Sequence, residues 1–592
     1  MRREQSLQSH DFDVKHYRIA LTIDDDTQSF TGETHVSFSS LTDGLDSMTL
    51  HTVSFTVGSV IDDQGNSLEF TQDDAALTIA LHQSLEKHEA ATLAIEYGAS
   101  NIGIEKTVGL DFRLETETNP QIANSLNWPI GARYWFPSFD HPSDWASHET
   151  IITVKDTYRV VANGSRLSDI VDTDSGLRTV HWHQTKPQPT YLYSFAAGPY
   201  SVLEDQHGEL PLHYWVYPGD EAVGRRAFER TPEIIAYYED MYGTGFPWVK
   251  YDQIIVPGMN GGAESTSATL LGRSVIKHER DGNNGASDWL LAHEIAHQWW
   301  GDLIGYRDWT HAWMAESFAS DGEYLFILDD DGADAGALYL LDYKDSYLEE
   351  AHEKFIRPIV TSKWDKPNDM FDRHGYEKGA VVLNMLRDLV GTDTYDEILS
   401  RFLAKHAYSN VTTDDFLEMV KEVTGKDYDW FFDQWLFSPG HPVLAVSYAW
   451  DANTKKLVLT IRQTQDTNAG VPIFRLPIKI GITTSTGKNI ESVWLTGQLQ
   501  SFEFDVALQP LMVRFDEGDI LLKEWELDKP VSELMYQLKH DNVIGRLWAI
   551  SNLQEHTNAP PVRSSLEAVA EQDAAEAVRE AALALLSAQE KD

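Results

Sequence analysis

The chain has 592 residues, enough for three or four domains with large buried cores. Hydrophobic residues make up 42% of it and no apolar run approaches the length of a membrane helix, which excludes an integral membrane segment. A formal net charge of −46, from 93 acidic and 47 basic residues, excludes nucleic acid and anionic membranes as partners.

The same composition bears on metal chemistry and location. With no cysteine, any metal must be bound by histidine and carboxylate side chains.

The acidic charge either keeps the protein soluble, including in a saline habitat, or attracts cationic substrates such as free peptide N-termini. We favour the first because the charge is spread along the chain. The polar N-terminal stretch MRREQSLQSHDFDVKHY lacks the apolar core of a signal peptide, so we expect a cytoplasmic protein, or a periplasmic or secreted one if a signal was removed. The sequence indicates no oligomeric state.

Residues 1–202 are expected to form an all-β domain. Short runs of alternating apolar and polar residues, such as 17–23 and 33–38, are separated by Gly, Asn and Asp clusters. Its late strands are expected at 150–154 and 190–197. This pattern predicts a large open sheet, or saddle.

Residues 203–440 change to a helical pattern. Amphipathic spacing runs over 222–242, and 251–256 is expected to be a strand. Three glycines between Gly258 and Gly262 permit close backbone approach there. Residues 280–287 are expected to be a loop, in which Ser287 caps the next helix and Asp288 lies in its first turn. Further helices are expected over 312–326, 379–389, 394–406 and 413–423.

Two smaller segments follow. Alternation returns at 443–449, 457–463, 477–483 and 502–506, which predicts a small β-sandwich over 441–527. Residues 528–592 are helical in pattern and begin like a HEAT-type helical pair. The predicted fold is therefore a multidomain α+β protein with four domains.

One motif in the second of these segments carries metal chemistry. His293, Glu294 and His297 form an H-E-x-x-H pattern, and on a helix positions i and i+4 share a face. Two imidazoles can therefore bind one metal ion, while Glu294 reaches a water. With eighteen residues between it and His297, Glu316 is a candidate third ligand. Glu323 lies on the same helical face and can accept a hydrogen bond from a ligand imidazole.

The alternative reading of this motif is a surface helix with two solvated histidines. Apolar neighbours on both sides, including Leu290, Leu291, Trp299 and Trp300, argue that the helix is buried. Burying imidazoles and carboxylates without a partner is costly, so a zinc site is the favoured interpretation, with one Zn²⁺ per chain.

The spacing resembles that of the gluzincin aminopeptidases, the family of aminopeptidase N and leukotriene hydrolase. The family's G-x-M-E-N signature is matched in part by Gly261-Gly262-Ala263-Glu264-Ser265, and its Y-E-K-G signature by Tyr376-Glu377-Lys378-Gly379. Residues 131–140 and 435–442 also match, so the resemblance covers nearly the whole chain. It implies a thermolysin-like α/β catalytic domain over 203–440.

The resemblance also implies roles for several residues. Glu294 would be the general base and then the general acid, and the phenol of Tyr376 would stabilise the oxyanion. A carboxylate can pair with an ammonium group, so Glu264 is the candidate for binding the substrate N-terminus. The backbone of Gly261, Gly262 and Ala263 could pair with an extended substrate as an added strand.

One position departs from the family pattern. Related enzymes place Glu or Gln five residues before the arginine matched by Arg133, and here that position is Trp128, with Asn127 beside it. Either the loop is shifted or the second amine anchor is missing, and Trp128 instead lines the first side-chain pocket. The preferred N-terminal residue of the substrate is therefore left open.

We expect a zinc aminopeptidase that releases neutral or basic N-terminal residues from peptides with a free N-terminus. Two alternatives are an epoxide hydrolase of the leukotriene hydrolase type and an inactive peptide-binding homologue. Nothing in the sequence specifically supports the first, and the intact motif with Glu294 and Tyr376 argues against the second.

Overall fold

The computed structural model describes residues 10–100, 102–103, 108–117, 119–280 and 287–588. The start of the polar N-terminal stretch and most of the loop predicted at 280–287 lie outside these residues. The chain divides into two compact units. The first unit comprises Met1–Glu323, Ser362–Phe371 and Asp396–Met419, and the second comprises Tyr324–Thr361, Asp372–Tyr395 and Val420–Asp592.

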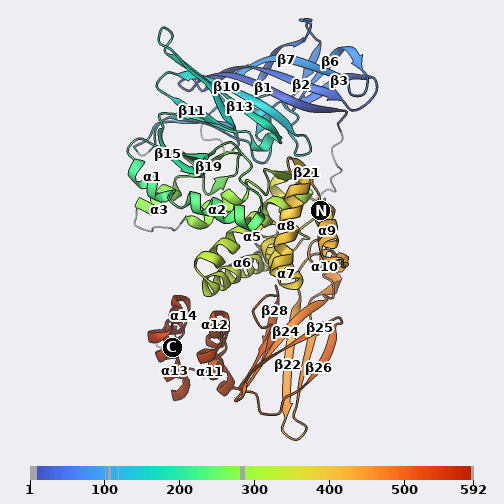
Figure 1. The fold of residues 1–592 in the computed structure, drawn as a ribbon, viewed down its shortest axis with the longest axis vertical. Helices are drawn as coiled ribbons and strands as arrows, with labels where there is room; N and C mark the ends of the chain where they lie inside the picture. Colours follow the sequence, from blue (N-terminus) through green and yellow to red (C-terminus); the bar gives the residue numbers. More distant parts are fainter. Residues whose placement is uncertain (1–9, 101, 104–107, 118, 281–286, 589–592) are drawn as a thin grey trace. The chain divides into compact units, whose positions relative to one another are not determined.

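The N-terminal part of the first unit is built from β-sheets (Figure 1). Its largest sheet runs, in spatial order, β12 (Ser165–Asp172), β13 (Leu177–Gln188), β10 (Ala146–Lys155), β1 (Phe12–Asp24), β2 (Ser29–Ser40), β7 (Ala90–Ala99) and β4 (Thr56–Asp62). A second sheet contains β11 (Arg159–Ala162), β14 (Phe195–Gly198), β9 (Ile122–Leu126) and β8 (Gly109–Arg113), and a third β3 (Leu45–His51), β6 (Ala76–Leu85) and β5 (Phe70–Gln72). Alternate side chains of β1 are buried, as the alternating sequence predicts.

A mixed sheet follows in the first unit. Its order is β15 (Ser201–His207), β16 (Leu210–Val216), β17 (Tyr251–Val256), β19 (Ala268–Gly272) and β18 (Gly262–Ala263), with β16, β17 and β19 parallel and β18 antiparallel at the edge. Every residue of β17 is buried, as is usual where a strand is covered on both faces. The helices here are α1 (Glu221–Ala227), α2 (Thr231–Tyr242), α3 (Ser274–Arg280), α4 (Asp288–Ala296) and the start of α5 (Trp313–Asp330).

Further short elements complete this unit. The strands β20 (Ile304–Tyr306) and β21 (Ser409–Val411) pair in parallel, and the helices α8 (Thr392–His406) and α9 (Thr413–Thr424) contribute most of their length. Single 3₁₀ turns lie at η1 (Ala132–Tyr134), η2 (Thr190–Leu192), η3 (Trp309–His311) and η4 (Pro367–Met370).

The second unit combines helices with two sheets. Its helices include α6 (Ala333–Glu353), α7 (Gly379–Val390) and α10 (Asp429–Trp435). A π-helix, His374–Lys378, directly precedes α7. The two sheets are drawn in orange in Figure 1. One contains β26 (Leu499–Asp505), β23 (Lys456–Gln463), β22 (Val443–Asp451) and β28 (Glu524–Leu527), and the other β25 (Gly487–Leu495), β24 (Leu476–Thr484) and β27 (Met512–Phe515).

Four helices end the described chain. They are α11 (Val531–His540), α12 (Val543–Asn552), α13 (Pro560–Gln572) and α14 (Glu576–Ala588). Their apolar faces form one core, against which Ala337, Leu338 and Leu341 of α6 pack.

The predicted multidomain α+β fold class is confirmed. The boundaries at 202, 440 and 527 stay a prediction, although the character of the elements changes close to each of them. Among the described residues, none of the helices has the length and apolar character needed to cross a bilayer.

Two predicted elements are wrong in detail. The helix expected over 222–242 is two helices, because Pro232 lacks an N–H group and fits only in the first turn of a new helix, α2. The strand expected over 190–197 begins instead with the turn η2, and only Phe195–Gly198 is extended. The Thr190 hydroxyl donates to Asp140 Oδ1 at 2.8 Å, a contact that strand alternation does not reveal.

Candidate metal centre and active site

The helix α4 and the residue after it carry the H-E-x-x-H motif. His293, Glu294 and His297 are all buried, and Leu290, Leu291 and Ile295 surround them with apolar side chains. His297 keeps helical backbone angles, φ −56° and ψ −27°, so both imidazoles face the same side. The two Nε2 atoms lie 3.1 Å apart.

Glu316, in the first turn of α5, brings a carboxylate to the same point. Its Oε2 lies 3.7 Å from His293 Nε2 and 3.3 Å from His297 Nε2. For ligand atoms about 2.0–2.1 Å from a tetrahedral zinc ion, the spacing between ligands is about 3.3 Å. The three atoms therefore have the separation that a single zinc ion requires.

Each imidazole uses its other nitrogen away from this point. His293 Nδ1 lies 3.1 Å from Glu323 Oε2, and His297 Nδ1 lies 2.8 Å from the carbonyl oxygen of Trp300. Both acceptors require an N–H donor, so they favour the tautomers in which Nε2 carries a lone pair. Two lone pairs and a carboxylate converging in a buried place repel one another unless a cation lies between them, so the donor set fits a metal ion.

Glu294 points toward the edge strand β18. A Cβ atom added to Gly262 would lie 2.4 Å from Glu294 Cδ, so only glycine allows this approach. Glu294 Oε2 is buried and has no hydrogen-bond partner among the described residues. Burial raises the pKa of Glu294 to about 7 against the opposing effect of His293 and His297, which suits a group that exchanges a proton near neutral pH.

Glu264 follows β18 directly. Its side chain is 5% exposed, and Oε1 has no hydrogen-bond partner among the described residues. Burial raises the pKa of the carboxyl, and the neighbouring Glu316 adds to the shift. A buried carboxylate oxygen without a donor is unfavourable by itself, so Glu264 is suited to a cationic ligand.

The predicted substrate-pairing segment lies at a sheet edge. Gly262 and Ala263 form β18, which pairs with β19 on one side and ends the sheet on the other. Gly261 has φ of +94°, a conformation that glycine adopts readily. The outer edge of β18 can accept an added strand.

Trp128 and Asn127 have different surroundings. Asn127 is fully buried, accepts a hydrogen bond from Trp135 Nε1 at 2.7 Å and donates to the Thr190 carbonyl at 3.1 Å. It is committed to the interior. Trp128 packs on Phe371, with ring centroids 4.1 Å apart, beside a cluster that includes Tyr191 and Tyr306. Both tyrosines lie close enough to Glu264 for its charge to raise their pKa further, beyond the main effect of burial.

The remaining predicted residue, Tyr376, lies in the second unit. It belongs to the π-helix His374–Lys378 and is half-buried.

The predicted cap of α4 is wrong in one respect. Ser287 occupies the N-cap position, but its hydroxyl bonds to His278 Nδ1 at 3.0 Å and caps no backbone N–H. Asp288 lies in the first turn as predicted, and it also pairs with Arg230 at 3.1 Å. The partner histidine belongs to another helix, α3, and spacing alone cannot identify it.

Gln298 is a site residue that the sequence reasoning missed. It is fully buried, donates from Nε2 to the Glu264 carbonyl at 2.8 Å and accepts from the Ser267 N–H at 2.8 Å. Gln298 therefore connects the metal-binding segment to the loop that carries Glu264. A polar residue directly after His297 within an apolar run was the available signal.

Comparison with known families identifies the chain. The Peptidase M1 N-terminal domain matches residues 13–192, and the Peptidase family M1 domain matches residues 226–435. Together these ranges cover more than half of the chain, which belongs to peptidase family M1. The resemblance recognised from the motifs is confirmed.

Several curated proteins are similar to the chain. Aminopeptidase 2 of Candida albicans is 24% identical over 498 residues, which cover 81% of this chain and 53% of that protein. Puromycin-sensitive aminopeptidase of Caenorhabditis elegans is 24% identical, with 85% and 55% covered. Glutamyl aminopeptidase of Bos taurus is 27% identical, with 59% and 37% covered. The chain spans about half the length of the first two of these relatives, and less of the third.

A solved structure shares the fold. The crystal structure of Legionella pneumophila aminopeptidase A in complex with aspartic acid matches with a TM-score of 0.82 and 20% sequence identity. The match covers 96% of this chain and 67% of that chain.

The contact between Gly262 and Glu294 leads to a prediction. Gly262→Ala should lower kcat/KM by roughly ten-fold or more, because the new methyl group displaces the Glu294 carboxylate. Gly58→Ala is the control, since its added Cβ would meet only the Glu96 carbonyl oxygen at 3.7 Å. Steady-state kinetics with the metal content measured in parallel tests this, and an unimpaired Gly262→Ala enzyme would contradict it.

Proposed function

We propose that the chain is a zinc-dependent aminopeptidase that hydrolyses the first peptide bond of peptides with a free N-terminus. The observation that carries the proposal is the convergence of His293, His297 and Glu316 at 3.1–3.7 Å beside the buried carboxylates of Glu294 and Glu264. Family membership and relatives named as aminopeptidases support it. They do not favour epoxide hydrolysis or an inactive binding protein.

His293, His297 and Glu316 would hold one Zn²⁺ per chain, and Glu323 would orient His293. When bound, zinc supplies Lewis acidity and makes water a stronger nucleophile. Glu294 would accept a proton from the attacking water and deliver it to the leaving amine.

Recognition of the substrate N-terminus would fall to Glu264. Its Oε1, which has no partner in the part of the chain that the structure describes, can accept a charge-assisted hydrogen bond from the ammonium group. The backbone of Gly261, Gly262 and Ala263 would pair with the substrate as an added strand. Because Asn127 is committed to Trp135 and Thr190, we propose that Trp128 replaces the second amine anchor and lines the pocket for the first side chain.

The phenol of Tyr376 would donate a hydrogen bond to the oxygen that gains negative charge in the transition state. The matched Y-E-K-G sequence supports this assignment.

The assignment of Glu294 is tested by Glu294→Gln. The variant should keep one zinc ion per chain, because the ligands remain, while kcat falls by about 10²-fold or more. Atomic absorption and an aminoacyl chromogenic amide measure the two properties. Glu316→Ala is the contrasting variant and should lose the metal. Zinc bound at normal affinity in Glu316→Ala would remove Glu316 from the ligand set.

Glu264→Ala should raise KM and lower kcat/KM by roughly ten-fold or more, a loss of at least about 1.4 kcal/mol, because the ammonium group loses its partner. It should also weaken the preference for free over acetylated N-termini. One peptide with free and blocked ends measures both effects, and Glu209→Ala, an exposed acid in the same unit, is the control. If the variant rejects the blocked peptide as strongly as wild type does, another group recognises the substrate N-terminus.

Tyr376→Phe should lower kcat by about 10²-fold with a smaller change in KM, since the phenol is proposed to act in the transition state. Zinc content should not change. An unaltered kcat would leave Tyr376 with a packing role only.

A further inference from the structure

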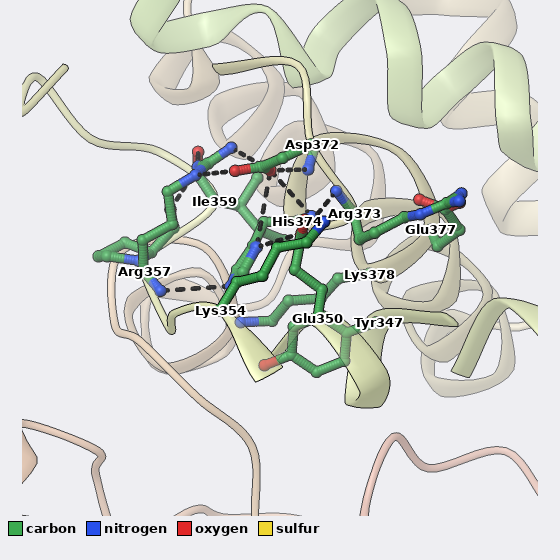
Figure 2. A network of polar contacts seen from close by, with 12 residues as sticks. Tyr347, Glu350, Lys354, Arg357, Ile359, Asp372, Arg373, His374, Glu377 and Lys378 are labelled. Carbon is green, nitrogen blue, oxygen red and sulfur yellow. Dashed lines mark hydrogen bonds and ion pairs between the residues drawn. The ribbon is translucent and has the colours of Figure 1, made fainter. Parts of the chain in front are cut away.

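The π-helix that contains Tyr376 begins in a buried polar network (Figure 2). At its centre, Arg357 forms a two-point ion pair with Asp372, from Nε to Oδ2 at 2.8 Å and from Nη2 to Oδ1 at 2.6 Å. Nη1 of the same guanidinium donates to the carbonyl oxygens of Pro358 and Ile359 at 2.6 and 2.8 Å. Such fork-shaped pairs restrict orientation as well as adding energy.

His374 extends the network from the guanidinium to a second carboxylate. The imidazole is fully buried, and its Nε2 accepts the backbone N–H of Arg357 at 3.2 Å. Nε2 therefore carries a lone pair, so the proton of the neutral ring is on Nδ1, which donates to Glu350 Oε2 at 3.3 Å. The ring also stacks on Phe355, with an interplanar angle of 8°.

The two carboxylates bind the backbone at the start of the π-helix. Glu350 Oε2 accepts the N–H of Arg373 at 2.8 Å. Asp372 Oδ1 accepts the N–H groups of His374 at 3.0 Å and of Gly375 at 3.3 Å. The first N–H groups of a helix have no partner within it, and here side chains from two segments satisfy them.

The far end of the π-helix is also held. Lys378 is fully buried, donates from Nζ to the Gly440 carbonyl at 3.0 Å and lies 5.2 Å from the centre of the Tyr347 ring. The Lys378 N–H bonds back to the Arg373 carbonyl at 2.9 Å, the five-residue step that defines a π-helix. Tyr376 therefore lies between two anchored ends, on a turn wider than that of α7.

The same side chains also resemble a metal site, since donor atoms of Glu350, Asp372 and His374 lie within 4.8 Å of one another. Their lone pairs have other partners, however. Asp372 faces Arg357 with both oxygens, and His374 uses Nε2 for the Arg357 N–H and Nδ1 for Glu350. A guanidinium already provides the positive charge that a cation would supply.

We propose that Arg357, Asp372, His374 and Glu350 are positioning residues that fix the orientation of the Tyr376 phenol for the reaction. The inference rests on the proposed role of Tyr376. The network holds the backbone of the π-helix rather than the phenol, so its effect on the reaction passes through Tyr376.

A double-mutant cycle tests this, using the full-length zinc enzyme. Asp372→Asn keeps the shape of the side chain but places an amide group against Arg357. It should lower kcat about ten-fold, with KM within about two-fold and zinc unchanged at one ion per chain. In the Tyr376→Phe background, the same change should lower kcat by less than about two-fold. Asp388→Asn is the matched control, because Asp388 lies on α7, the helix after the π-helix, and the change removes only an exposed ion pair with Lys479 of β24.

His374→Asn is the second variant, in case Asp372→Asn does not fold. The amide nitrogen can replace Nδ1 toward Glu350, while the Arg357 N–H loses its acceptor. The loss of kcat in His374→Asn should be smaller than in Asp372→Asn. In the Tyr376→Phe background, His374→Asn should cause no further loss.

If Asp372→Asn lowers kcat equally in the wild-type and Tyr376→Phe backgrounds, the network has a general structural role and the proposal is overturned. Unchanged kcat in Asp372→Asn and His374→Asn, together with a defective Tyr376→Phe, would overturn the positioning inference alone. A fully active Tyr376→Phe would instead refute the proposed role of Tyr376, and the positioning inference with it. A second bound metal ion lost in Asp372→Asn would also overturn the proposal, in favour of a metal site.

Discussion

The cost of burying charge without a partner governs the centre of this protein. His293, His297, Glu294, Glu316, Glu323 and Glu264 are all buried within one neighbourhood, and they carry more acceptors than donors. Some of this mismatch is resolved internally, since Glu323 and the Trp300 carbonyl each accept a hydrogen bond from an imidazole N–H. What is left is a set of lone pairs around one point and, on each of Glu294 and Glu264, an oxygen that no described residue hydrogen-bonds. These groups are stable together when positive charge is supplied from outside, by a metal ion and by a cationic substrate.

The fold brings these buried groups together by packing the edge strand β18 against the helix α4. The Glu294 side chain lies so close to β18 that a Cβ atom at position 262 would displace its carboxylate, and Gln298, just after α4, hydrogen-bonds to the Glu264 carbonyl, just after β18. Glu294, the proposed general base, and Glu264, the proposed partner of the substrate ammonium group, are thus positioned by neighbouring contacts. A displacement of either element would alter both functions at once.

Local patterns predicted the parts of the structure that depend on local spacing. The i, i+4 relation of His293 and His297 follows from helix geometry alone, and the separation of Glu316 from Glu323 places both on one face of α5. The alternation of residues 17–23 correctly indicated β1. The placement of Glu264 and Tyr376 depended instead on family resemblance, because a glutamate after glycines or a single tyrosine has no distinctive local pattern.

What the sequence patterns did not reveal depends on contacts between different elements. Ser287 turns to His278 rather than capping α4, and Asn127 is committed to Trp135 and Thr190. The π-helix depends on Glu350, which precedes His374 by 24 residues, and no local propensity predicts a five-residue step. Tertiary contacts decided each of these positions.

The two histidines proposed to bind the metal ion differ in the kind of group that supports them. His293 is hydrogen-bonded through Nδ1 to a side chain, that of Glu323, whereas His297 is hydrogen-bonded through Nδ1 to the main-chain carbonyl of Trp300. Every residue type except proline would present much the same carbonyl at position 300, so that acceptor is independent of which side chain the gene encodes there. The acceptor for His293 can be lost through one codon change. A substitution at position 323 can therefore adjust the basicity of one proposed ligand directly, while the other is altered only by changing the path of the main chain.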